Sequence, residues 1–330
     1  PYYQICNFRG GIAYVPFRCL LPRGLEGILV TGLGVSAHCD AIPSVRMQPD
    51  VQNLGYAAGA AAAAAAAAGC PLRRLDLAPV QQHLADLGCL PAEVPDHEDS
   101  FPVSDAVLRD AVRRLVSDGY EQLHVIMAAP ERSLPLMRRA YAEAASENGR
   151  LRCAHVLGMM GDAAGVETLI RAVRSIDTFE GEKIGRYVPN MTWLASYLLA
   201  LGRSGDRRCT GVILEKLRMY EESTAGQWSD LQALTLALEA LGDPRAAPAL
   251  ARQVERMADG YPAVTTVKDA VSESRDKSGR GLLILARALY RCGDREGLAK
   301  RVLQGYADDV RGPFARHAAA VLAERGKGGK

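Results

Sequence analysis

The side chains best suited to chemistry lie in one loop early in the chain. This loop holds His38, Asp40, Ser44, Arg46 and Gln48, which offer an imidazole, a carboxylate, a hydroxyl, a guanidinium and an amide. It leads directly into a stretch of very small residues with the composition of a helix. The first turn of a helix presents unpaired N–H groups and the positive end of the helix dipole. The loop and the helix start could therefore hold an anionic or electron-rich ligand.

Two regular elements are expected to position this loop. Ile28 to Val30 form a short apolar run that leads to Gly32, which is typical of a buried strand that enters a turn. From about Val51 the sequence becomes helical, and an alanine-rich run continues to Ala68. A glycine and a nearby proline then end the helix. The small side chains would let the helix backbone lie close to whatever packs on it.

The glycines after this strand also fit a second interpretation. GLGVSA, residues 32–37, matches the G-x-G-x-x-A fingerprint of a dinucleotide-binding turn. That fingerprint requires a helix that starts at its second glycine, and an acidic residue about 20 positions further on, at the end of the next strand. Pro43 and Pro49 interrupt any such helix, and Asp50 opens a helix instead of closing a strand. The strand, loop and helix therefore indicate a unit other than a complete dinucleotide fold.

Three blocks of this region resemble one known family, in the same order and at similar spacing. They read PFRCLLPRGLEGILVTG, then SAHCDAIPSVRMQP, then LGYAAGAAAA. They are similar to the C-terminal end of the FAD domain in a bacterial family of FAD-dependent oxidoreductases, whose members read PYR-LLP-G--NLLVAGR, SATHEA-GS-R--P and GQAAGTAAA. The resemblance covers about Tyr14 to Leu87. The family has an arginine where this chain has Leu33, so any charge contact of that arginine is missing here.

The resemblance implies that the chain is the C-terminal portion of an oxidoreductase that uses FAD and acts on an organic substrate. The main chain would approach the flavin closely, and the implied cofactor-binding residues are Gly32, Leu33, Gly34, Ser44, Val45, Arg46, Met47, Gln48 and Pro49. His38 would be catalytic, as an acid, a base or an orienting donor on the substrate side of the flavin ring. A histidine bound to backbone carbonyls and a surface arginine are the structural alternatives for His38 and Arg46. The enzyme would be incomplete on this chain alone, because the dinucleotide motif is absent.

The second part of the sequence predicts helices only, in a repeated pattern. Gly-Asp pairs recur between amphipathic segments, at 161–162, 205–206, 242–243 and 293–294. Glycine permits the left-handed end of the first helix, and aspartate can cap the second. Apolar residues on both sides of the pairs have the spacing of one helix face. The pattern resembles HEAT-like repeats of the bacterial LGD type, whose helix pairs stack into an α-solenoid.

The predicted fold class is therefore mainly α, with a partial α/β segment, the end of an FAD-binding domain, followed by a HEAT-like α-solenoid. The expected divisions are a flavin segment at 1–90, a linker rich in proline and acid at 91–103, and helical repeats at 104–325. Residues 177–190 and 259–279 would be insertions between repeat units. The rival interpretation is a non-catalytic HEAT-repeat module for protein interaction, with the first hundred residues as a packed cap.

Composition excludes several classes of function. The formal net charge of +2 gives no broad basic surface, so nucleic acid is not an expected partner. The eight cysteines are scattered without a C-x-x-C pair, so no metal site is expected. The longest run of small apolar residues is shorter than the ~20 residues that a membrane span needs. The expected partners are a small-molecule substrate and, through the helical repeats, a protein.

The two ends of the sequence carry further expectations. The chain begins Pro-Tyr-Tyr, with neither a methionine nor a signal-peptide pattern, and we expect that truncation removed the true start. A cytoplasmic location is favoured on this chain, although an N-terminal targeting signal could be missing. Two β-prone runs between Tyr2 and Cys19 surround a Gly-Gly turn and predict a hairpin. The final GKGGK is expected to be disordered.

Overall fold

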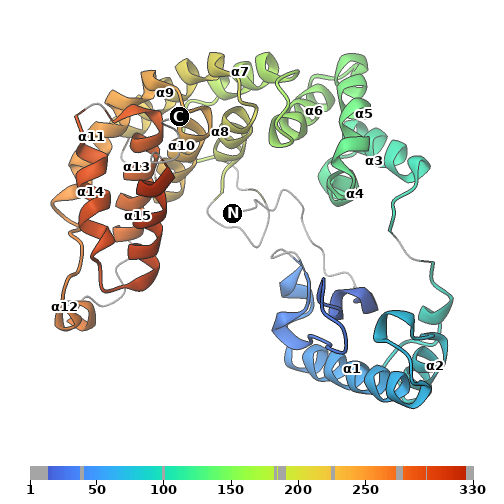
Figure 1. Cartoon of the computed structure of the whole chain (residues 1–330). Coiled ribbons are helices and arrows are strands. Elements are labelled where there is room, and N and C mark those ends of the chain that lie inside the picture. The colour runs from blue at the N-terminus through green and yellow to red at the C-terminus, as the bar shows by residue number, and fades with distance from the viewer. Residues whose placement is uncertain are drawn as a thin grey trace. The chain divides into compact units, whose positions relative to one another are not determined.

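The computed structural model describes residues 14–324 except for 38–40, 99–100, 182–183, 185–190, 224–226, 273–277 and 295. The chain divides into two compact units, with the division between Pro102 and Val103 (Figure 1). We call the described residues before this division unit 1 and those after it unit 2. Both units are helical, and the described residues contain no β-strand.

Unit 1 is built on one long helix, α1 (Gln48–Ala68). It ends at Gly69, which adopts the left-handed conformation with a φ of 60°. Ala58, Ala61 and Ala65 form its buried stripe, on which the second helix and the preceding loops pack. The other elements of unit 1 are η1 (Phe17–Leu20), η2 (Gly32–Gly34), η3 (Ile42–Ser44), η4 (Leu72–Arg74), α2 (Ala78–Asp86) and η5 (Val94–Asp96). The alanine stripe lets the elements that pack on it approach the helix backbone, but alanine itself contributes little buried apolar area.

The strand predicted at Ile28–Val30 is not formed. Within the described residues this run has a single backbone hydrogen bond, from the N–H of Val30 to the carbonyl of Leu20 at 2.8 Å. A strand needs a neighbour that pairs along its length, and the described part of unit 1 does not supply one. The predicted α/β segment is therefore not found there. The end of the predicted hairpin is also different, because Phe17–Leu20 forms the 3₁₀ turn η1, and the first half of the hairpin lies outside the described residues.

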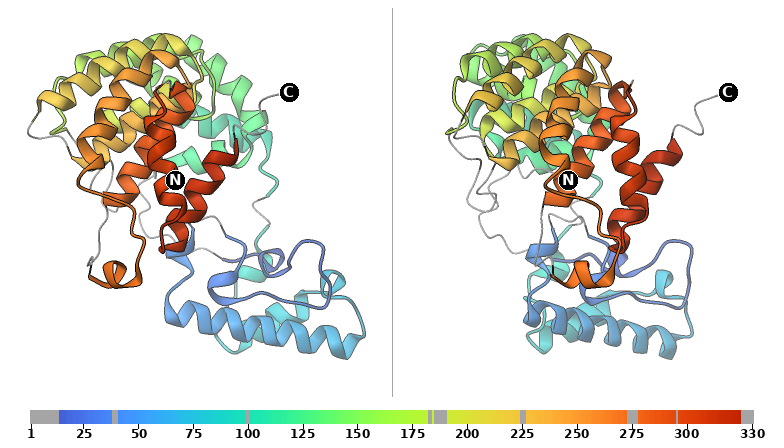
Figure 2. Two further views of the ribbon diagram at one scale, coloured as in Figure 1. Left: turned by 60° about the vertical axis from the view of Figure 1, so that its left-hand side comes forward. Right: turned by 90° about the vertical axis from the view of Figure 1, so that its left-hand side faces the viewer.

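Unit 2 is an array of packed helices. Their bounds are α3 (Asp105–Ser117), α4 (Leu123–Ala128), α5 (Pro130–Glu143), α6 (Glu147–Met159), α7 (Val166–Ser175), α8 (Trp193–Arg203), α9 (Thr210–Glu222), α10 (Trp228–Leu241), α11 (Ala247–Ala258), α12 (Val267–Ser272), α13 (Ser278–Gly293), α14 (Leu298–Ala307) and α15 (Gly312–Glu324). Short 3₁₀ turns also occur: η6 (Tyr120–Gln122), η7 (Arg207–Cys209) and η8 (Pro244–Ala246). Helices α6, α8, α10 and α13 pack on one another in this order, and α7, α9, α11 and α14 lie beside that row (Figures 1 and 2). The arrangement is compatible with an α-solenoid.

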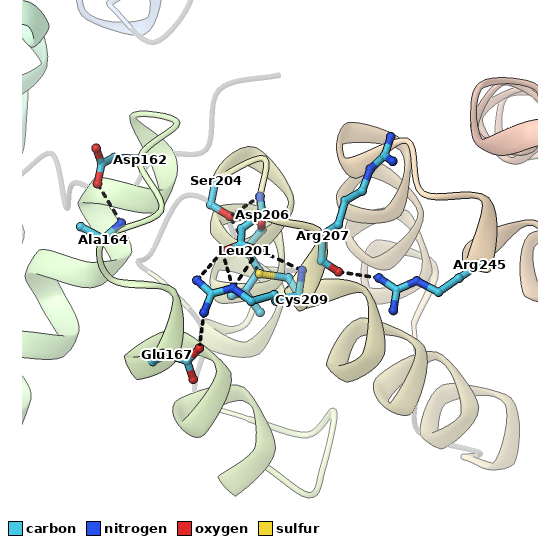
Figure 3. A network of polar contacts seen from close by, with 10 residues as sticks. Asp162, Ala164, Glu167, Leu201, Ser204, Asp206, Arg207, Cys209 and Arg245 are labelled. Carbon is cyan, nitrogen blue, oxygen red and sulfur yellow. Dashed lines mark hydrogen bonds and ion pairs between the residues drawn. The ribbon is translucent and has the colours of Figure 1, made fainter.

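Four turns of unit 2 use the predicted Gly-Asp pairs. Their glycines have positive φ angles between 55° and 113°, as left-handed helix ends require: Gly161, Gly205, Gly242 and Gly293. In the first three turns the aspartate accepts a hydrogen bond from the N–H two residues later, at 2.9–3.0 Å, and Figure 3 shows the first of these bonds, from Ala164 to Asp162. Asp309 accepts the same bond from Arg311 at 2.8 Å. This turn was not predicted, because no glycine precedes its aspartate.

Arginine side chains link the turns of unit 2 to one another. In three turns the residue two positions after the aspartate is an arginine that pairs with it: Arg208 with Asp206, Arg245 with Asp243, and Arg311 with Asp309. Arg208 also reaches Glu167 at 2.9 Å, and Arg245 donates to the carbonyl of Arg207 at 2.7 Å (Figure 3). The Arg245 guanidinium holds the pKa of Asp243 well below its usual range. Neighbouring helix pairs are therefore joined by charged hydrogen bonds as well as by apolar packing.

Candidate functional site

The structure brings two of the predicted flavin-binding stretches to the start of α1. Turn η2 packs on α1, and Val51 of the helix lies 3.6 Å from the position that a Cβ atom on Gly32 would occupy. Gly32 itself has a φ of 65°, which favours glycine. The second stretch, Val45 to Pro49, leads from η3 into the first turn of the helix. Predicted residues that are 10 or more positions apart in the sequence therefore share one end of α1.

This end of α1 presents an apolar surface with one cation. Leu33 is 69% exposed and Met47 is 49% exposed, so both apolar side chains are accessible to a ligand. Arg46 is exposed and has no ion pair or hydrogen bond in the described part of the chain. Val45 is half-buried and contributes to the small core of unit 1 instead. The surface therefore suits a flat apolar group that carries negative charge or electron-rich atoms.

The backbone at the helix start offers hydrogen-bond donors. The N–H of Val51 bonds to the carbonyl of Met47 at 2.9 Å, and this is the first hydrogen bond of α1. The N–H groups of Gln48 and Asp50 precede it and have no carbonyl partner in their own helix. Pro49 has no N–H to contribute. Two donors at the positive end of a helix are thus available to a ligand.

The predicted catalytic residue is not tested by the structure. His38 lies outside the described residues, and the side chain of Ser44 is not described. Its role as an acid, a base or an orienting donor therefore stays a prediction.

One comparison with known families concerns the residues of unit 1. Residues 8–84 match the model of a family described as FAD dependent oxidoreductase. The match identifies an FAD-dependent oxidoreductase-like region, with FAD as its cofactor and a small molecule as the class of its substrate. No curated protein matches the chain. The matched residues end before unit 2, so the family match does not explain the helical array.

Two further kinds of site are not found in the described ranges. None of these residues forms a group of three or more histidine, cysteine, aspartate or glutamate side chains able to hold a metal ion. The helices of the described chain also include none with the length and apolar character that would carry it across a membrane.

Unit 2 contains a buried series of hydrogen-bonded polar side chains that was not predicted. The Oγ of Ser196 lies 2.8 Å from Nε2 of His155, and Nδ1 of His155 lies 3.0 Å from the hydroxyl of Tyr120. The order matches a nucleophile, a base and an orienting group, but His155 is fully buried, and burial lowers its pKa to about 3. Such an imidazole is too weak a base for catalysis at neutral pH. These hydrogen bonds between side chains are therefore structural and hold η6 and α8 to α6. The three residues are far apart in the sequence, and no local pattern predicts that they meet.

Acid is expected to destabilise unit 2 through His155. Its pKa is about 3 in the fold, against an ordinary value of 6.5. Between these values the unfolded chain binds a proton that the folded chain does not, so the stabilisation is complete above pH 6.5 and is lost as the pH falls towards 3. At about pH 5 we expect a loss of about 2 kcal/mol relative to about pH 7. Denaturant unfolding followed by circular dichroism at the two pH values measures it.

The matched variant is His155→Gln, which has no proton to gain in this range. It should be less stable than the original chain at neutral pH, because the glutamine fills the site poorly. Its loss between the two pH values should be smaller by about 2 kcal/mol. An equal loss in both proteins would show that other groups cause the acid sensitivity.

Proposed function

We propose that unit 1 forms one wall of the flavin site of an FAD-dependent oxidoreductase that acts on an organic substrate. The observation that carries the proposal is the convergence of η2 and the Val45–Pro49 stretch at the start of α1, within the residues that match the family. In this role the wall closes over the flavin ring and the ribityl chain. FAD supplies the acceptor for a hydride or for electrons when it is bound.

The residues present fit this role. Leu33 and Met47 offer apolar contact to a flat ring, and their exposure leaves them accessible. The N–H groups of Gln48 and Asp50 suit the electron-accepting edge of the ring, where negative charge develops on reduction. Arg46 adds a cation for which the described residues supply no partner. In the same proposal His38 orients the substrate or exchanges a proton with it.

For unit 2 we propose HEAT-like repeats of the LGD type that bind a protein partner. The specific support is the recurrence of one turn, in which a glycine with positive φ precedes an aspartate that accepts from the N–H two residues later. The row of α6, α8, α10 and α13 gives each helix pair its neighbours. This role is compatible with the flavin role of unit 1, because the two roles use different residues.

The flavin proposal is tested by titrating the full chain with FAD and with riboflavin, while flavin fluorescence is followed. We expect a dissociation constant for FAD no lower than about 1 μM, a binding free energy of ~8 kcal/mol, because the chain lacks the glycine fingerprint that holds the pyrophosphate. Riboflavin should bind about as well as FAD, since the wall contacts the ring end. The change Leu33→Gln should weaken both affinities about fivefold, because it removes apolar contact area.

The matched control is Leu25→Gln. Leu25 is also an exposed leucine of unit 1, at 54%, but it lies outside the two predicted stretches. We expect it to leave flavin binding unchanged. Equal effects of the two substitutions, or no binding of either flavin at about millimolar concentration, would contradict the proposed wall.

A further inference from the structure

Three aromatic rings lie side by side near the start of α8 in unit 2. Trp193 and Tyr197 are one helical turn apart on α8, and Tyr120 comes from η6. The ring centroids of Tyr120 and Trp193 are 5.4 Å apart, those of Trp193 and Tyr197 are 5.8 Å apart, and each pair is tilted by 31°. All three side chains are only partly buried. They form an apolar surface that remains partly accessible.

The charge of Arg152 acts on two of these rings, and the described residues give it no counter-charge. Arg152 of α6 is half-buried, and it donates one N–H group to the carbonyl of Val116 at 2.9 Å. No carboxylate pairs with it in the part of the chain that the structure describes. Its charge acts on the hydroxyls of both Tyr120 and Tyr197 and opposes the rise in their pKa that burial causes. A half-buried cation whose described partners are neutral carbonyl groups lacks a counter-charge, and an anionic ligand would supply one.

The other unused polar groups at this surface can all donate a hydrogen bond. The Tyr197 hydroxyl and the Trp193 indole N–H have no hydrogen-bond partner among the described residues. Burial raises the pKa of Tyr197 to about 12, so its hydroxyl keeps its proton at neutral pH. Partly buried polar groups are usually satisfied by a partner. The two donors therefore suit a ligand that brings a hydrogen-bond acceptor, and the nearby positive charge favours an acceptor that is negatively charged.

The buried His155 holds the rings in place. It bonds to the Tyr120 hydroxyl, and its ring meets that of Tyr197 edge to face with centroids 4.9 Å apart. Ser196 fixes the opposite side of the imidazole. Side chains that are already fixed lose little conformational entropy when a ligand binds.

We propose that this aromatic–arginine surface, formed by Tyr120, Arg152, Trp193 and Tyr197, binds an acidic peptide segment of a protein partner. A carboxylate of the peptide pairs with Arg152 and accepts from Tyr197. An aromatic side chain next to that carboxylate packs on the rings. Charge complementarity selects this occupant, because the surface offers hydrogen-bond donors and one cation, and no described carboxylate pairs with that cation.

The test uses the full chain with Trp228→Phe, which leaves Trp193 as the single tryptophan of the sequence. The probe is the peptide acetyl-Gly-Glu-Phe-Glu-Gly-amide, and its matched partner has glutamine in place of both glutamates. We expect the acidic peptide to change the Trp193 fluorescence saturably. The glutamine peptide should bind about tenfold more weakly, because it loses the charge-assisted hydrogen bonds.

Two variants examine the protein side of the contact. Arg152→Gln should weaken binding of the acidic peptide about tenfold, and Tyr197→Phe, which removes only a hydroxyl, should weaken it about threefold. Arg150→Gln is the control, since Arg150 is a half-buried arginine of the same helix. It donates to the Ala144 carbonyl at 2.8 Å and forms no ion pair with the described residues. The substitution should leave binding unchanged. Circular dichroism checks that each variant is folded. If Arg152→Gln does not fold, the effect of Tyr197→Phe on peptide binding tests the proposal by itself.

Several results would overturn the proposal. One is equal affinity for the acidic and the glutamine peptides, which would remove the role of the carboxylate. Another is an equal loss of binding in the Arg150 and Arg152 variants, which would indicate a general charge effect. A third is the absence of saturable binding up to about 10 mM peptide, which corresponds to a binding free energy of less than ~3 kcal/mol. It would show that the surface does not bind such a segment.

Discussion

Glu239→Gln is expected to destabilise unit 2 by about 3–5 kcal/mol, because it leaves two guanidinium groups without their shared counter-charge. Glu239 lies on α10 with its side chain 6% exposed. It accepts from Arg287 at 2.6 and 2.8 Å and from Arg291 at 2.6 Å. Glutamine has nearly the same shape, so the loss reports on charge rather than on packing. Denaturant unfolding at neutral pH, followed by far-UV circular dichroism, measures it.

An exposed ion pair of the same array provides the control. Glu215 pairs with Arg174 at 3.4 Å, and the two side chains are 44% and 58% exposed. Because solvent screens such a pair, Glu215→Gln should cost less than about 1 kcal/mol. Similar losses in the two variants would mean that the charge on Glu239 contributes no more than a surface charge. In the Glu239→Gln variant, Arg291 keeps its ion pair with Glu324 at 2.6 Å. This remaining pair offsets part of the lost stability, so the loss could lie at the lower end of the range given for that variant.

Gly202→Ala is the second change with a large expected effect, a loss of about 1–3 kcal/mol from overpacking. Gly202 lies within α8, where a Cβ atom would be 2.4 Å from the Cα of Ala237 on α10 and 2.7 Å from its carbonyl oxygen. These are backbone atoms, which cannot rotate away, so the two helices would have to separate. Elsewhere in a helix alanine is favoured over glycine by about 1 kcal/mol. A thermal melt followed by circular dichroism should show a lower midpoint for the variant.

Gly305→Ala is the matched control for this change. Gly305 lies within α14, and apart from its chain neighbours and its own helix backbone, no heavy atom of the described residues is within 4 Å of the position of its Cβ. The substitution should therefore stabilise the helix by about 0.5–1 kcal/mol. Opposite signs for the two glycines are the expected result. A neutral or stabilising Gly202→Ala would contradict the close approach of α8 and α10.

The sequence by itself predicted the features that depend on neighbouring residues. Helix α3 (Asp105–Ser117) follows Ser104, whose Oγ caps the helix by accepting from the N–H of Val107 at 3.3 Å. Helix α1 ends at Gly69 as predicted, although it begins at Gln48, three residues before the predicted start. Caps, glycine turns and apolar periodicity act over a few residues, so they are visible in the sequence.

The candidate flavin site was also partly visible in the sequence, because its residues follow one another in a short segment that the family match includes. Their exposure was not predictable. Val45 and Leu33 are both apolar loop residues, yet Val45 packs in the core and Leu33 is mostly exposed. Which of two similar side chains faces outward depends on packing partners elsewhere in the chain.

Only the tertiary structure decided the features that join distant residues. The run Ile28–Val30 has the composition of a strand but no partner along its length in the described residues. The glycines of Leu201-Gly202-x-x-Gly205 look alike in the sequence, but Gly205 has a φ of 72° and forms a turn, whereas Gly202 lies at a helix crossing. Glu239 meets Arg287 across 48 residues. Pairing, close approach and burial of charge depend on which elements meet in space, and local periodicity carries no information about that.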